Sequence, residues 1–233
     1  MSYKLHLFTS GMYRTLMVNQ NQPARDAEST VPWHSLEQWR STAFLIAGGL
    51  ILGFVASNGV EAFTAAQPPT WVNTLFVAPA LVAATVGLLG FYPLLTDQVP
   101  RLALASAAVV TVAGTAAIAL FVVVTANGLI AGLQLPFLPI YFLTLLTTIL
   151  GFVLVGVGSL WTSVPSRTVG LLVLGPPTVN IIMLLTAPMN PPQWSAFLIS
   201  AMWCGAVLAI GVALRSSSAN LDRSDRSIDS AAR

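Results

Sequence analysis

The residues best suited to chemistry lie in one apolar stretch, Gly175-Pro176-Pro177-Thr178-Val179-Asn180, which is flanked by TVGLLVL and IIMLLTA. In a helix, this proline pair leaves the carbonyls of Leu172 and Val173 without their usual N–H partners. Thr178 and Asn180 follow at once and offer a hydroxyl and a carboxamide. These groups could bind a solute inside a membrane, as interrupted helices do in many transporters. The alternative is a structural kink in which Asn180 hydrogen-bonds to a neighbouring helix.

Other residues with useful chemistry are few. Glu61 lies just past the outer end of the first apolar segment, where it is either a solvated interfacial residue or a further binding residue. Both histidines, His6 and His34, precede that segment, and Cys204 has no second cysteine to pair with. The sequence lacks the motifs of phosphate-binding loops, dinucleotide folds and zinc proteases. We therefore expect no catalytic residue, no metal site and no cofactor.

The segments that hold these residues are strongly apolar. Hydrophobic residues make up 55% of the 233 residues and charged residues only 8%, whereas soluble domains carry about 25% charged residues. So few charges cannot cover a water-facing surface, so the main solvent is the lipid bilayer. The sequence therefore predicts an integral membrane protein, and we do not expect nucleic acid as a partner.

Six apolar segments are long enough to cross a bilayer as helices, because about 20 residues at 1.5 Å each span the hydrocarbon core. The proline pair lies within the fifth segment, and dividing that segment there would leave two pieces too short to cross. We therefore expect an all-α bundle of six transmembrane helices, with a helix kink at Gly175, Pro176 and Pro177. The predicted spans are residues 41–60, 72–91, 102–125, 139–160, 168–187 and 194–214.

The basic residues indicate how the bundle is oriented. With six spans, all 10 lysines and arginines fall on one side of the membrane, in the two tails and in the loops that contain Arg101 and Arg167. Basic residues are retained on the cytoplasmic side, so the sequence predicts a multi-pass protein of the cell membrane with both termini in the cytoplasm. We expect a mobile tail at 1–32, in which Met17 is an alternative start, and a disordered tail at 216–233.

The six spans could also form three helical hairpins of about 60 residues each. The first, third and fifth spans begin after an arginine, and the others begin with proline and an aromatic residue. This pattern is either an internal repeat or the usual chemistry of a membrane interface. Residues 33–41 could form a short interfacial helix before the first span. Small residues at four-residue spacing could pack inside the bundle or against a second copy: Gly49 and Gly53, and Ala201, Gly205, Ala209 and Ala213.

The stretch GFYPLLTDQVPRLALA, residues 90–105, combines a Gly-aromatic-Tyr-Pro turn, a short polar loop and a Pro-Arg-Leu restart. Together with SVPSRTVGLLVL, residues 163–174, it resembles a group of prokaryotic six-span integral membrane proteins of unknown function. The resemblance implies six spans and a prokaryotic membrane, and it implies no activity.

These observations leave three classes of function. The first, which the small residues at four-residue spacing and the scarcity of reactive groups favour, is an accessory or structural membrane subunit. It would act through helix contacts with a partner protein or with a second copy of the chain. The second is a facilitator or channel for a neutral or apolar solute that uses the kinked fifth span, with Asn180 and Thr178 as binding residues. The third is a membrane-embedded enzyme, which the scarcity of nucleophiles, bases and metal ligands disfavours.

Overall fold

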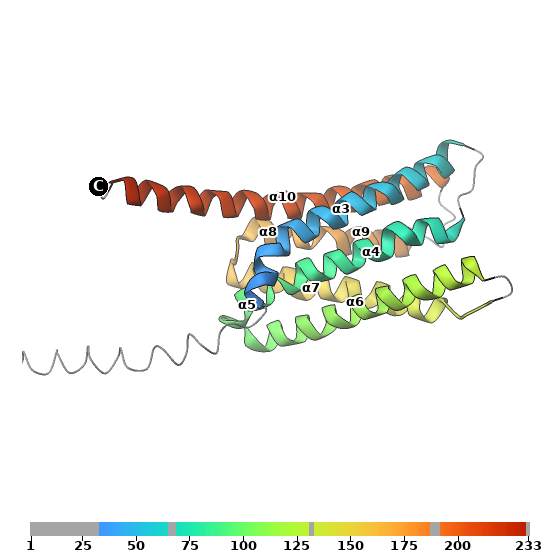
Figure 1. Cartoon of the computed structure of the whole chain (residues 1–233), viewed down its shortest axis with the longest axis horizontal. Coiled ribbons are helices and arrows are strands. Elements are labelled where there is room, and N and C mark those ends of the chain that lie inside the picture. Colours follow the sequence, from blue (N-terminus) through green and yellow to red (C-terminus); the bar gives the residue numbers. More distant parts are fainter. Residues whose placement is uncertain (1–32, 65–68, 131–132, 187–191, 232–233) are drawn as a thin grey trace, which may run out of the picture. The chain divides into compact units, whose positions relative to one another are not determined.

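The structure is a computed structural model that describes residues 33–64, 69–130, 133–186 and 192–231. These residues form helices and no strands. Residues from Ser35 onward form one compact unit, to which the following description refers. The predicted tail at 1–32 lies outside the described residues. The helices are α3 (Trp33–Phe63), α4 (Thr70–Leu89), α5 (Tyr92–Thr96), α6 (Pro100–Leu129), α7 (Leu138–Thr162), α8 (Arg167–Val173), α9 (Gly175–Thr186) and α10 (Gln193–Ala231) (Figure 1).

The predicted all-α fold with six membrane-spanning helices is confirmed for the described part of the chain. The second span combines α4 with α5, and the fifth combines α8 with α9. The chain is therefore a multi-pass membrane protein. The spans are Gln38–Phe63, Trp71–Thr96, Pro100–Leu129, Leu138–Thr162, Arg167–Leu185 and Trp194–Ser217.

Two terminal stretches differ from the sequence-based expectation. Residues 33–41 do not form a separate interfacial helix, because α3 runs from Trp33 into the first span without a break. Residues 216–233 were expected to be disordered, yet α10 is helical as far as Ala231. Both stretches lack glycine and proline, and extending an existing helix avoids the cost of forming a new helix nucleus.

The spans pack side by side in chain order, and glycines lie at their contacts. A Cβ atom added to Gly87 of α4 would lie 2.7 Å from Phe44 Cε2 of α3, so the Phe44 ring packs directly against the backbone of α4 at this glycine. The first and last spans also meet, because Gly211 of α10 faces Leu45 of α3. Such close approach increases the dispersion energy between membrane helices. Further contacts are Gly114 with Thr85 (α6 and α4), Gly151 with Val110 (α7 and α6), Gly170 with Leu160 (α8 and α7), and Gly175 with Ala206 (α9 and α10).

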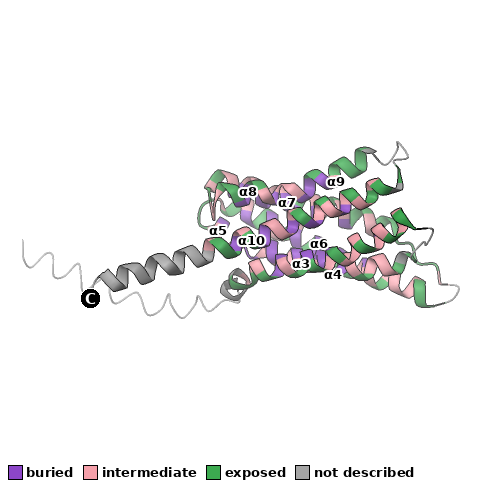
Figure 2. Ribbon diagram, turned by 90° about the horizontal axis from the view of Figure 1, so that it is seen from above, coloured by how far each residue is buried: buried purple, intermediate pink, exposed green. Residues whose placement is uncertain are grey.

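The three predicted hairpins belong to one bundle. Helices of different hairpins touch as well as helices of the same hairpin, since α4 packs on α6 and α7 packs on α8. Buried residues face the interior of the bundle, and exposed residues cover its outer surface (Figure 2).

The bundle has two different ends because successive spans run in opposite directions (Figure 1). One end, here called the basic end, carries Arg40, Arg101, Arg167 and Arg215. The other, here called the loop end, carries the connections from α3 to α4, from α6 to α7 and from α9 to α10.

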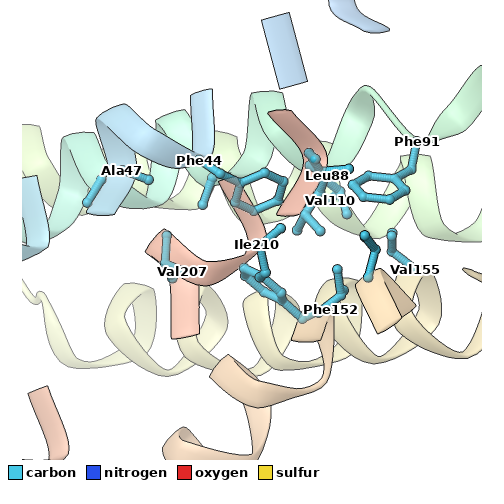
Figure 3. Close-up of a cluster of buried hydrophobic side chains, with 14 of the residues drawn as sticks. Phe44, Ala47, Leu88, Phe91, Val110, Phe152, Val155, Val207 and Ile210 are labelled. Carbon is cyan, nitrogen blue, oxygen red and sulfur yellow. The ribbon is translucent and has the colours of Figure 1, made fainter. Parts of the chain in front are cut away.

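The half of the bundle nearer the basic end is filled with large apolar side chains. Phe44, Phe91 and Phe152 are almost completely buried. The ring centroid of Phe44 lies 6.4 Å from that of Phe91 and 6.4 Å from that of Phe152 (Figure 3). The Arg40 guanidinium lies 5.8 Å from the centre of the Phe91 ring, a favourable cation–π distance. We call these rings and their buried neighbours the packed half; the neighbours are Leu88, Leu95, Val110, Val155, Val169, Val173, Val207, Ile210 and Leu214.

Candidate functional site

The half of the bundle nearer the loop end contains a cavity of about 450 Å³. This volume is within the range of small-molecule pockets, about 300–1,000 Å³. In every span, the residues that line the cavity lie nearer the loop end than the residues of the packed half. All six spans contribute, for example through Phe54 (α3), Val77 (α4), Val124 (α6), Leu145 (α7), Met183 (α9) and Ile199 (α10).

The polar side chains that line the cavity are uncharged. Three asparagines reach it from three helices: Asn58 from α3, Asn73 from α4 and Asn180 from α9. In the described part of the chain, the lining contains no Asp, Glu, Lys, Arg or His. A charged ligand would find no countercharge here, so the cavity suits a neutral molecule. The other polar lining residues are Thr74, Tyr141, Thr144, Thr148, Ser195, Ser200 and Trp203.

Several of the hydroxyl groups in the lining already donate to a carbonyl oxygen three or four residues earlier in the chain. Thr144 Oγ1 donates to the carbonyl oxygen of Ile140 at 2.8 Å, and Ser200 Oγ donates to that of Phe197 at 2.9 Å. Ser195 Oγ donates to the carbonyl oxygen of Pro192 at 2.6 Å. Because a hydroxyl has one proton and two lone pairs, these three groups keep only their acceptor capacity for a ligand.

Two polar atoms of lining residues are buried without a hydrogen-bond partner among the described residues. They are the carboxamide oxygen of Asn73, an acceptor, and the indole nitrogen of Trp203, a donor. A buried polar group without a partner costs about 1–3 kcal/mol of stability. Two residues that line the cavity therefore each retain one buried polar atom whose hydrogen-bonding capacity the described residues do not use.

Asn180 lines the cavity, whereas the other two predicted binding residues do not. Thr178 is exposed, and its Oγ1 donates to the carbonyl oxygen of Leu174 at 2.8 Å. Residues two apart on a helix differ in direction by about 200°, so Thr178 faces outward when Asn180 faces inward. Glu61 is half-buried near the end of α3 and is not part of the described lining.

The fifth span is interrupted directly before Gly175-Pro176-Pro177. α8 ends at Val173, Leu174 lies between the helices, and α9 begins at Gly175. The backbone N–H of Thr178 donates to the Leu174 carbonyl at 3.3 Å, and the Thr178 hydroxyl donates to the same oxygen. The interruption divides the span into α8, which belongs to the packed half, and α9, which lines the cavity.

Sequence analysis missed most of the lining. A search for asparagine near the loop end of a span would find Asn58 and Asn73. It would also find Asn127, which has a different role, because its carboxamide makes two hydrogen bonds to the backbone of Leu135, at 2.9 and 2.8 Å. Pro79 inside α4 was missed as well. It follows Ala78, which lines the cavity, so a second helix carries a proline at this depth.

A shallow groove of about 400 Å³ lies on the outside of α3, α4 and α6. Ala78 lines both this groove and the cavity, so α4 separates the two at that point. The residues that line the groove are apolar, which matches the acyl chains of a bilayer. They are Ile46, Leu50, Ala78, Pro79, Val82, Ala83, Ile118 and Phe121.

No family model matches the sequence, and no curated protein or solved structure matches it either. The resemblance to prokaryotic six-span proteins stays a prediction.

Proposed function

We propose that this membrane protein binds a small, neutral and largely apolar molecule between its six spans and facilitates its passage across the membrane. The supporting observation is the cavity of about 450 Å³, to which every span contributes and whose described lining is uncharged. Mostly apolar walls with a few placed polar groups are typical of small-molecule sites. The position of Asn180 in the lining favours this function over that of an accessory subunit.

The packed half determines from which end of the bundle a solute can reach the cavity. In this conformation, Phe44, Phe91 and Phe152 fill the bundle between the cavity and the basic end. A facilitator of this design exchanges its solute at the loop end and must part these rings to release it at the basic end.

We infer that the basic end faces the cytoplasm of a prokaryotic cell. Arg40, Arg101, Arg167 and Arg215 all lie at that end, and the positive-inside rule assigns it to the cytoplasm. A reporter that is active only in the cytoplasm should therefore be active when fused after Arg233. Activity of an exported reporter at the same position would reverse the orientation.

A cavity-filling variant tests the binding step. Val124 and Val122 lie two residues apart on α6; Val124 lines the cavity, whereas Val122 is 57% exposed on the outside. We expect toluene or benzyl alcohol to raise the melting temperature of the wild type and of Val122→Phe in nanodiscs, but not that of Val124→Phe. Benzoate and benzylammonium should have no effect. The proposed function is wrong if neither neutral probe binds, or if Val124→Phe binds them as the wild type does.

The second candidate function is an accessory membrane subunit. Gly49 of α3 and Gly205 of α10 are exposed, with open space within 4 Å of the position of a Cβ atom. Small residues on an outer face allow a helix of another protein to approach closely. Native mass spectrometry after mild solubilisation would favour this function if a partner or a second copy is retained and Gly49→Leu releases it. If the wild type and Gly49→Leu are both monomers without a partner, the result would count against the accessory function.

A further inference from the structure

We propose that the ligand of the cavity carries a hydroxyl or amide group on its apolar body, and that polar side chains from α3, α4, α7, α9 and α10 bind this group. The inference rests on the proposed function, because it concerns the same cavity. It narrows the ligand from any neutral molecule to one that both donates and accepts a hydrogen bond.

The asparagines supply the first part of the argument. Asn58, Asn73 and Asn180 come from three different helices and line one cavity. A carboxamide carries two donors and an acceptor oxygen, and burying it in an apolar region is unfavourable without a partner. Asn58 is only 8% exposed, so bulk water is not its main surrounding. Three carboxamides around one cavity favour a ligand that offers both hydrogen-bond donors and acceptors.

The unpaired atoms point to the same ligand chemistry. The buried oxygen of Asn73 needs a donor, and the buried N–H of Trp203 needs an acceptor. The terminal torsion of an asparagine side chain is soft, so a small rotation can turn its oxygen toward a bound group. A hydrocarbon would leave both atoms unsatisfied, whereas a hydroxyl or amide can serve as donor and acceptor at once.

The remaining hydroxyl groups favour a donor on the ligand. Thr144, Ser195 and Ser200 already donate to backbone carbonyl oxygens three or four residues earlier in the chain. Their oxygens can therefore only accept from a ligand. The apolar lining residues, among them Phe54, Leu120 and Met183, leave room for an apolar body beside the polar group. The ligand class is therefore a neutral alcohol, phenol or amide with an apolar body.

Toluene and benzyl alcohol test this inference, because they differ in a single hydroxyl group. Affinities are measured on the full-length protein in nanodiscs and corrected for the partition of each probe into the lipid. We expect the wild type to bind benzyl alcohol about fivefold more tightly than toluene, the effect of one net hydrogen bond. Asn180→Leu should lose this preference and still bind toluene, which shows that the variant is folded.

A matched pair on α7 localises the effect. Thr148 lines the cavity and is 7% exposed, whereas its neighbour Thr147 is outside the lining and donates to the Leu143 carbonyl. Thr148→Val should reduce the preference for benzyl alcohol, and Thr147→Val should leave it unchanged. Equal affinity for both probes in the wild type, with Val124→Phe blocking both, would overturn the inference and leave the proposed function intact. Binding of neither probe would overturn both.

Discussion

The packed half and the loop-end half are built from the same six spans, yet their interiors differ. Phe44, Phe91 and Phe152 fill the first, whereas Asn58 and Asn180 are among the residues around the cavity of the second. Both halves lie within apolar helices, so hydropathy does not separate them. The two halves differ instead in the volume and polarity of their inward-facing side chains. The comparison supports the proposal that one half supplies stability and the other supplies a binding site.

One helix irregularity lies between the halves, and a second lies beside the cavity. The fifth span is interrupted at Leu174, and Pro79 lies inside α4 beside the cavity residue Ala78. Proline removes a backbone hydrogen bond and commonly bends a helix. The fifth span therefore has a weakened point where the packed half meets the cavity, and α4 has one beside the cavity.

The largest effect is expected from truncating the centre of the packed half. Phe152→Ala removes a ring that is 1% exposed and that packs on Phe44. Cavity creation at a buried phenylalanine costs about 3–5 kcal/mol, so we expect a loss of about 3 kcal/mol in the free energy of unfolding, measured by reversible denaturation in mixed micelles. Phe142→Ala is the control, because Phe142 lies on the same helix and is 45% exposed. Equal losses for the two variants would remove the energetic distinction between core and surface on α7.

A smaller effect on stability, of opposite sign, is expected in the half nearer the loop end. Asn58→Leu replaces a buried carboxamide that lines the cavity, and we expect the free energy of unfolding to rise by about 1 kcal/mol because the cost of burying a polar group is removed. Asn127→Leu makes the same chemical change at a carboxamide that holds the backbone of Leu135 through two hydrogen bonds. It should lower stability by about 1 kcal/mol. Both values come from the unfolding measurement used for Phe152→Ala, and a destabilised Asn58→Leu would show that Asn58 is structural.

The number of spans could be predicted from the sequence, but the two halves could not. Apolar length and the placement of arginine are properties of single segments. The buried face of a span is not a property of that segment alone, because the lipid and the protein interior are equally apolar. Leu146 is 60% exposed and Val155 is 1% exposed, although both are aliphatic residues of α7. For the same reason, no local pattern identified Phe44, Phe91 and Phe152 as neighbours.

One residue of the cavity lining could be predicted for a local reason. Asn180 follows the proline pair closely, and that pair interrupts the span in the structure. Helix periodicity could have separated Asn180 from Thr178, because two residues cannot face the same way at a spacing of two. The place of Trp203 in the lining depends on packing between distant segments, and its position in the sequence carries no comparable signal.

The smallest expected effect lies at the boundary between the halves. Thr178→Val removes the hydroxyl that donates to the Leu174 carbonyl at 2.8 Å, where the helix is interrupted and the backbone N–H lies 3.3 Å from the same oxygen. Thr111→Val removes a bond of the same length, to the Ala107 carbonyl, within the uninterrupted helix α6. Hydrogen bonds within membrane proteins contribute about 0.6 kcal/mol on average, so Thr178→Val should lower the free energy of unfolding by about that amount and Thr111→Val by less.

Hydrogen exchange should also become faster at the amide of Thr178 in the Thr178→Val variant. If the two variants are equally stable and exchange is unchanged, the Thr178 hydroxyl does not support the interruption, and the boundary is held by the packing of α8 and α9 against α10.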